Sequence, residues 1–237
     1  MTPTTPHDPA EAAKQRAAQW AAAQVEDGMA VGLGSGSTSA LVIDEVGRRV
    51  RDGLRITAIA TSLQSHRQAE SLGIPLTDFA RQPQLDLTID GADEVQRGTL
   101  ALIKGHGGAL LREKIVAMAS RRMLVAVDPR KIVDRLGSVF TVPVEVVPFG
   151  WETTQRRLRD QGFASELRRN DDGQPYITDG QHYILHCKLI ESGFTPEQAA
   201  EAFKRTTGVV EHGLFLGIAS QVVIGSAEKL DFLERTQ

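Results

Sequence analysis

Short apolar runs alternate with helical patterns through the first half of the chain. The apolar runs lie at 29–33, 54–60, 85–89, 100–103 and 123–127. Helical patterns precede them at 10–25 and separate them at 37–51, 62–72 and 109–120. Strands of a few residues that alternate with helices predict βαβ units, and therefore a Rossmann-like parallel sheet with helices on both faces.

The pattern changes after about residue 137. Strand patterns lie at 141–148, 163–168, 182–189 and 208–212, with helical patterns at 151–161 and 196–206. This order, β-α-β-β-α-β, is typical of a ferredoxin-like unit. The apolar run 221–224 could then rejoin the first sheet. We therefore expect an α/β domain over 1–136 and 213–237, with an inserted ferredoxin-like α+β domain over 137–212.

Composition narrows the function classes. The 237 residues are 41% hydrophobic and 24% charged, which is ordinary for a globular protein. A net charge of −3 provides no general field for nucleic acid or an anionic membrane. The sequence also contains no run near the ~20 apolar residues of a membrane span and no apolar core of a secretory signal. We expect a cytoplasmic protein that holds any phosphate through local groups.

The segment 32–38 is rich in glycine and hydroxyl groups and joins a predicted strand to a predicted helix. Backbone N–H groups around Gly36 and the start of a helix favour an anion. The side chains of Ser35, Ser37 and Thr38 add hydroxyl donors. The segment lacks the Gly-Lys-Ser/Thr of a P-loop. It predicts phosphate binding, and the alternative is a tight turn with a serine cap.

A second candidate segment is the acidic end of the run 85–94. Asp90 ends the predicted strand, and Asp93 follows after Gly91 and Ala92. Carboxylates at the end of a parallel strand point toward the ligand crevice. Catalysis or hydroxyl binding is the favoured interpretation, while capping of the next turn and metal binding are the alternatives.

A third segment repeats the strand, glycine turn and helix arrangement. Lys104 ends the strand, the turn is Gly105-His106-Gly107, and Glu113 lies about one turn into the helix. A partly desolvated glutamate near lysines can act as a general base. The alternative is an ordinary charged residue on a solvated helix.

The remaining candidate ligands for a metal are weak. The lone Cys187 excludes an intrachain disulfide and a multi-Cys zinc site. His182 and His186 lie in a predicted strand, where a spacing of four keeps them well apart. The residues alone therefore predict acid–base chemistry on a small phosphorylated metabolite, without a metal or a cofactor.

Together these segments resemble the type A ribose-5-phosphate isomerases. The matching motifs are GSGST at 34–38, TIDGADE at 88–94, IKGxGGALxREKIV at 103–116, PVEVVP at 143–148, and the GxF and VxIG segments within 213–225. The resemblance implies interconversion of D-ribose 5-phosphate and D-ribulose 5-phosphate through an enediol(ate), without a metal or nucleotide. It also implies a homodimer or homotetramer in which the inserted domain acts as a lid or assembly surface.

The resemblance also assigns roles by position. Glu113 becomes the base, while Asp90 and Asp93 contact sugar hydroxyls and help to open the ring, with Lys104 beside them. The substrate-contacting positions are Ser35, Gly36, Ser37, Thr38, Asp90, Gly91, Ala92, Asp93, Lys104, Gly105, His106, Gly107 and Lys131.

Some residues depart from the family pattern. His106 interrupts a glycine run, so it would be strained if that position needs positive φ, and it could place a titrating group near the phosphate. His186 and the segment 148–151 also differ. The same architecture occurs in sugar-phosphate deaminases and lactonases, acyl-CoA transferases and ligand-sensing domains, which therefore stay as alternatives.

Overall fold

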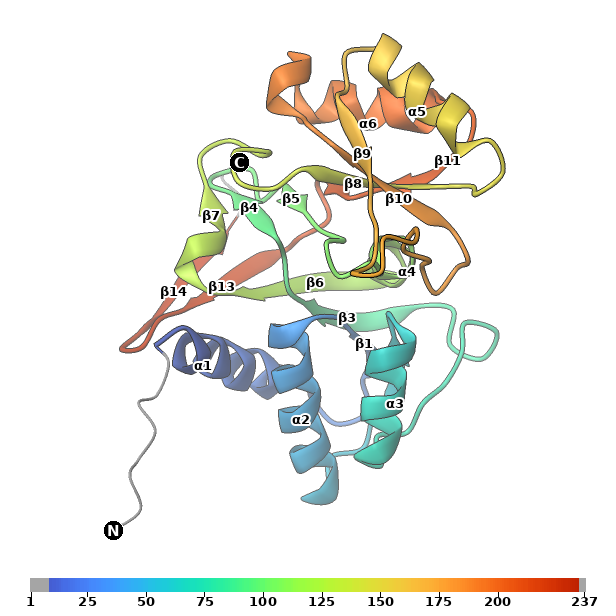
Figure 1. Cartoon of the computed structure of the whole chain (residues 1–237). Coiled ribbons are helices and arrows are strands. Elements are labelled where there is room, and N and C mark those ends of the chain that lie inside the picture. The colour runs from blue at the N-terminus through green and yellow to red at the C-terminus, as the bar shows by residue number, and fades with distance from the viewer. Residues whose placement is uncertain (1–8, 235–237) are drawn as a thin grey trace.

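The largest sheet has six strands in the order β14-β13-β6-β3-β1-β2 (Figure 1). This architecture is that of a computed structural model, which describes residues 9–234. β14 is antiparallel to β13, and every other neighbouring pair is parallel. The strands are β1 (Ala30–Leu33), β2 (Thr57–Ala60), β3 (Leu85–Asp90), β6 (Ser120–Val127), β13 (Gln221–Gly225) and β14 (Leu230–Glu234).

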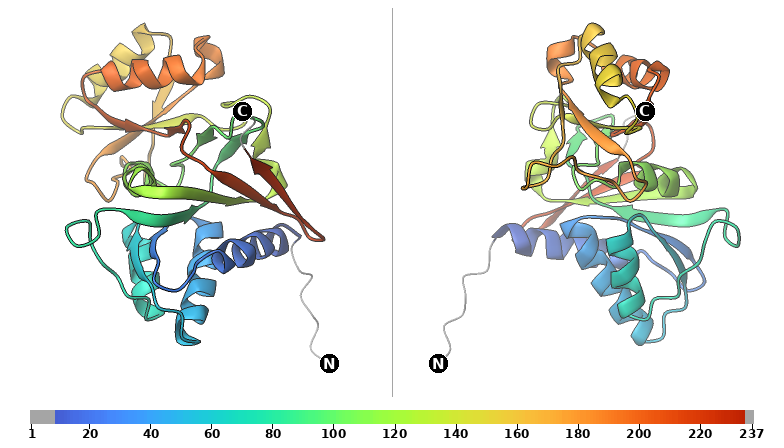
Figure 2. Two further views of the ribbon diagram at one scale, coloured as in Figure 1. Left: turned by 180° about the vertical axis from the view of Figure 1, so that it is seen from behind. Right: turned by 45° about the vertical axis from the view of Figure 1, so that its right-hand side comes forward.

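Helices cover both faces of this sheet, as the periodicity predicts. Helices α1 (Pro9–Ala23), α2 (Ser37–Arg51) and α3 (Leu63–Ser71) lie on one face, and α4 (Leu110–Met118) lies on the other (Figures 1 and 2). The apolar side of α2, with Val42 and Val46, is buried in the same cluster as Val31 and Leu33 of β1. Parallel strands buried on both faces need such continuous apolar runs.

A small second sheet was not expected. Its order is β12-β5-β4-β7, from β4 (Glu94–Gln96), β5 (Leu102–Ile103), β7 (Ile132–Val133) and β12 (Leu214–Phe215). The prediction that run 100–103 joins the parallel sheet is wrong. The chain reverses between β4 and β5 through Gly98 and Leu100, both at positive φ, and β5 therefore pairs antiparallel with β4 and β12.

The third sheet has the strand order expected for a ferredoxin-like unit. β8 (Val142–Val146), β9 (Ser165–Leu167), β10 (Tyr183–Cys187) and β11 (Val209–His212) form an antiparallel sheet in the order β11-β8-β10-β9. Helices α5 (Trp151–Asp160) and α6 (Pro196–Arg205) cover this sheet.

Short 3₁₀ turns lie at Pro129–Lys131 and Ile190–Ser192. No helix within residues 9–234 is both long and apolar enough to cross a membrane.

Candidate functional site

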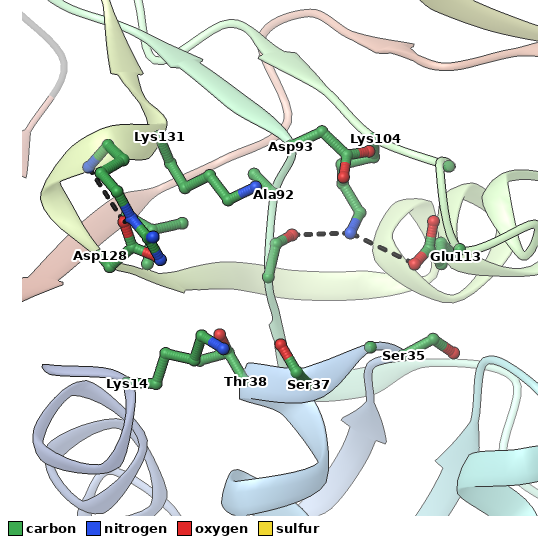
Figure 3. A pocket seen from close by; sticks show the side chains of 16 residues that line it. Lys14, Ser35, Ser37, Thr38, Ala92, Asp93, Lys104, Glu113, Asp128 and Lys131 are labelled. Carbon is green, nitrogen blue, oxygen red and sulfur yellow. Dashed lines mark hydrogen bonds and ion pairs between the residues drawn. The ribbon is translucent and has the colours of Figure 1, made fainter. Parts of the chain in front are cut away.

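A cavity of about 210 Å³ lies where β1, β3 and β6 end (Figure 3). The turns after these parallel strands meet there, together with the turn that precedes α4. Of the residues predicted for the site, those that line the cavity are Ser35, Gly36, Ser37, Thr38, Gly91, Ala92, Asp93, Lys104, Gly105, Gly107, Glu113 and Lys131. The three predicted segments, together with Lys131, therefore converge on one crevice although they lie far apart in sequence.

One end of the cavity, which we call the carboxylate end, contains Asp93, Lys104 and Glu113. The Lys104 Nζ lies 3.4 Å from Oε1 of Glu113 (Figure 3). It also lies 3.0 Å from Oδ2 of Asp90 and donates to the Gly91 carbonyl at 2.6 Å. The Lys104 and Glu113 side chains are only 3% and 5% exposed. The second Glu113 oxygen, Oε2, is buried and accepts no hydrogen bond. It is therefore free to accept a proton from a bound ligand.

Burial and neighbouring charges shift the pKa values of both Glu113 and Lys104. Burial raises the pKa of Glu113 to about 8, and the Asp90 and Asp93 carboxylates add to this, while Lys104 opposes it. Burial alone would lower the pKa of Lys104, but the Asp90 and Glu113 carboxylates raise it above its usual range. Lys104 is thus held as a cation, and the pKa of Glu113 lies near neutral pH, where a general base works well.

Asp90 lies behind the cavity and does not line it. Its Oδ1 accepts from the backbone N–H groups of Ser35 and Gly91 at 3.0 and 2.8 Å, and from the Ser39 hydroxyl at 2.9 Å. A Cβ at Gly34 would lie 2.1 Å from the same oxygen. Protein donors therefore surround Oδ1 of Asp90, and the expected contact of Asp90 with sugar hydroxyls stays a prediction.

His106 likewise turns away from the cavity. Its Nε2 lies 2.9 Å from the Thr141 carbonyl oxygen, and its ring packs 4.8 Å from those of Phe140 and His186. The His106 ring therefore does not line the cavity, although the backbone N–H of His106 donates to Oδ2 of Asp93 at 3.0 Å. Its contact with substrate stays a prediction. The non-glycine residues at positive φ within residues 9–234 are Leu100 and Gln181, so His106 is not strained.

The opposite end of the cavity, which we call the cationic end, contains Lys14, Lys131 and the start of α2. Helix α2 begins after Gly36, at φ 96°, with no side chain capping its N–H groups. Such a helix start attracts an anion. Ser37 and Thr38 face the space between Lys14 and Lys131 (Figure 3). By contrast, the Ser35 hydroxyl lies 2.7 Å from that of Thr61 and is already paired.

Sequence reasoning missed several residues that line the cavity. Lys14 is a cation within an Ala-rich helix, and nothing in its local sequence marks it. Asp128 and Arg130 lie beside Lys131 in the segment Asp-Pro-Arg-Lys, and Asp128 accepts two bonds from the Arg130 guanidinium, at 2.9 and 3.0 Å. Their proximity to Lys131 was the available signal. Within residues 9–234, no three His, Cys, Asp or Glu side chains gather as a metal site.

Comparison with known proteins gives this geometry a family. The model of ribose 5-phosphate isomerase A (phosphoriboisomerase A) matches residues 57–229. The chain belongs to the ribose 5-phosphate isomerase A family. The ribose-5-phosphate isomerase A of Synechococcus sp. (strain JA-3-3Ab) is 48% identical over 228 residues, which cover 96% of this chain and 99% of that protein. Members of the family are aldose–ketose isomerases, so the expected enzyme class is confirmed.

Solved structures of the family have the same fold. Ribose 5-phosphate isomerase A from Methanocaldococcus jannaschii superposes with a TM-score of 0.90 at 35% identity, covering 95% of this chain and 99% of its own. A D-ribose-5-phosphate isomerase in complex with phospho-erythronic acid gives the same TM-score, identity and coverage. The predicted α/β fold class, with its additional antiparallel unit, is confirmed.

Proposed function

We propose that this chain interconverts D-ribose 5-phosphate and D-ribulose 5-phosphate through an enediol(ate), with Glu113 as the general base. The reaction belongs to the non-oxidative branch of the pentose phosphate pathway. The observation that carries the proposal is the buried Glu113 carboxylate, whose Oε2 has no partner while Oε1 lies 3.4 Å from Lys104. A sugar-phosphate substrate is also consistent with a related isomerase, whose structure was solved in complex with phospho-erythronic acid.

In the proposed reaction Glu113 takes the proton from C2 of the open-chain aldose and returns it to C1. The proton of the C2 hydroxyl passes to the oxygen on C1, so C1 becomes a hydroxymethyl group and C2 becomes the ketone. Negative charge develops on the sugar oxygens as the enediolate forms. The Lys104 ammonium stabilises that charge by electrostatics, because the carboxylates around it keep its proton in place. Asp93 faces the sugar hydroxyls, while Asp90 acts from behind by orienting Lys104 and the turn at Ser35.

We assign the phosphate to the cationic end. Lys14 and Lys131 supply charge, and the uncapped start of α2 supplies N–H groups and the hydroxyls of Ser37 and Thr38. Binding energy gained on this remote group can hold C1 and C2 against Glu113. This assignment gives phosphate to the turn at 35–38 and sugar hydroxyls to the turns at 91–93 and 104–107.

The direct test is ketose formation from D-ribose 5-phosphate by the purified chain. Rapid formation of D-ribulose 5-phosphate is expected, and the same preparation should show no lactonase, deaminase or acyl-CoA transferase activity. A chain that binds the sugar phosphate without forming ketose would instead be a ligand sensor. That outcome would remove the proposal.

We further propose that residues 137–212 form the inserted lid domain and that the enzyme is a cytoplasmic homodimer or homotetramer. The antiparallel unit contributes Leu158, Phe163 and Phe203 to a buried cluster that continues into the small sheet at Ile103 and Leu214. Large apolar side chains that would be available to an assembly surface include Phe149, which is 94% exposed, and Met118, which is 67% exposed. Light scattering of the purified chain would test the assembly, and a monomer would contradict it.

A further inference from the structure

Lys114 is a buried cation to which the proposed reaction gives no role. It follows Glu113 on α4, and its side chain is 9% exposed. Its Nζ lies 2.8 Å from Oε1 of Glu211 and 2.5 Å from the His212 carbonyl oxygen, and 4.9 Å from the ring centre of Phe215. These partners all lie on β11 and β12, outside the six-stranded sheet. A buried ammonium is costly to retain unless such partners hold it.

The partner segment 211–215 also holds Lys104. The Lys104 backbone N–H donates to the Gly213 carbonyl at 2.9 Å, and a Cβ at Gly213 would lie 2.1 Å from the Lys104 carbonyl oxygen. The Phe215 ring lies 5.7 Å from the Lys104 Nζ. One segment therefore contacts Lys104 through its backbone and α4 through Lys114.

Helix α4 has little of its own to fix its start. It spans nine residues, and Ala109 caps it without a side-chain hydrogen bond. The base Glu113 lies in its first turn. A tie from the next residue to an external segment would therefore determine where this turn lies.

We propose that Lys114 is a positioning residue for Glu113. Its bonds to Glu211 and His212 fix α4 against segment 211–215. Because the same segment also fixes Lys104, these contacts together set the separation of Glu113 and Lys104. The inference rests on Glu113 being the base of the proposed function. Misplacement of a catalytic group by about 1 Å can cost about 10²-fold in rate.

The test is Lys114→Met, which keeps the length of the side chain and removes its charge. We expect kcat to fall about 10- to 100-fold, with KM within about threefold, because the cationic end is untouched. The kinetic isotope effect with substrate deuterated at C2 should rise, since proton transfer becomes slower than the other steps. Lys204→Met is the matched control, because Lys204 is an exposed lysine of α6 that lies with Lys114 in a separate surface pocket, outside the catalytic cavity. It should behave as the wild type.

Glu211→Gln provides a second variant that leaves the lysine in place. A smaller fall in kcat with a raised isotope effect is expected, and this variant decides the question if Lys114→Met does not fold. Wild-type kcat in both variants, or a loss that follows the unfolded fraction with an unchanged isotope effect, would overturn the inference. A wild-type chain that forms no ketose would instead overturn the proposed function, so the two failures are distinguishable.

Discussion

The two ends of the cavity handle charge in opposite ways. At the carboxylate end the ion pairs of Lys104 with Asp90 and Glu113 are complete and almost fully buried. At the cationic end Lys14 and Lys131 are partly exposed, and the start of α2 has no capping side chain. The carboxylate end is thus organised before ligand arrives. At the cationic end the N–H groups at the start of α2 have no capping side chain, and Lys14 is held only by a partly exposed ion pair with Glu11. Preorganised charge suits chemistry, and open donors suit binding.

Replacing the base should produce the largest effect. Glu113→Gln removes the proton acceptor with little change in shape, and kcat should fall at least ~10²-fold with a modest change in KM. Steady-state kinetics of ketose formation would measure this. Near-normal turnover would show that Glu113 is not the base. It would also contradict the assignment of chemistry to the carboxylate end and binding to the cationic end.

A change at the cationic end should act on binding instead. Lys131→Met removes one of the charges assigned to the phosphate, and hydrogen bonds to charged groups are worth ~1.5–3 kcal/mol. KM should therefore rise about tenfold or more, with a smaller change in kcat. Lys188→Met, which removes an exposed lysine outside the cavity, is the control. A loss confined to kcat would show that the ends are not separate in function.

The pH dependence tests the carboxylate end of the cavity. Burial raises the pKa of Glu113 to about 8, so the base is protonated at lower pH. Below about pH 8, kcat/KM should therefore fall about tenfold for each unit by which the pH decreases. The same shift makes Glu113 bind its proton more tightly in the folded chain. Its contribution to the free energy of unfolding should therefore decline as the pH rises toward 8. A kcat/KM that is constant between about pH 6 and pH 8 would contradict the shift.

His106 should matter less than any of these groups. His106→Gly retains the backbone N–H that holds Asp93. It loses the packing against Phe140 and His186 and the contact of Nε2 with the Thr141 carbonyl, all outside the cavity, so activity should stay within about tenfold. Kinetics and thermal unfolding of this variant would separate activity from stability. A larger fall in kcat at unchanged stability would give the imidazole a chemical role.

Metal removal should have the smallest effect. The Asp90 carboxylate already accepts from Ser35, Ser39 and Gly91 and pairs with Lys104, so it has little capacity left for a cation. Dialysis against EDTA should leave ketose formation unchanged. Activity that is lost and then restored by a divalent ion would revive the metal interpretation of this strand end.

The sequence predicted the parts of this arrangement that depend on local pattern. The helix expected at 37–51 is α2, and the turns expected at the ends of parallel strands do converge on one cavity. The small sheet escaped prediction because strands such as β5, with two residues, carry no measurable periodicity. Its pairing depends on a turn at Leu100 and on a strand that arrives more than a hundred residues later.

The direction in which side chains point was the second feature that the sequence could not predict. The sequence identifies Asp90 as a strand end, but the donors that enclose it come from the segment 35–39, which no local pattern connects to it. His106 was expected to face the ligand because it sits within a glycine turn, yet Thr141 and Phe140 hold its ring elsewhere. Lys14 lines the cavity from α1, a helix separate from the turns predicted to form the site.

The position of β13 has a consequence for how the enzyme is made. This strand, from the end of the described chain, is the neighbour of β6 on the side opposite β3. A nascent chain that has not yet extended beyond residue 220 would leave β6 as a bare edge, open to pairing with another molecule. The sheet beneath the cavity is therefore completed on this side only after residues 221–225 have been synthesised and have paired with β6.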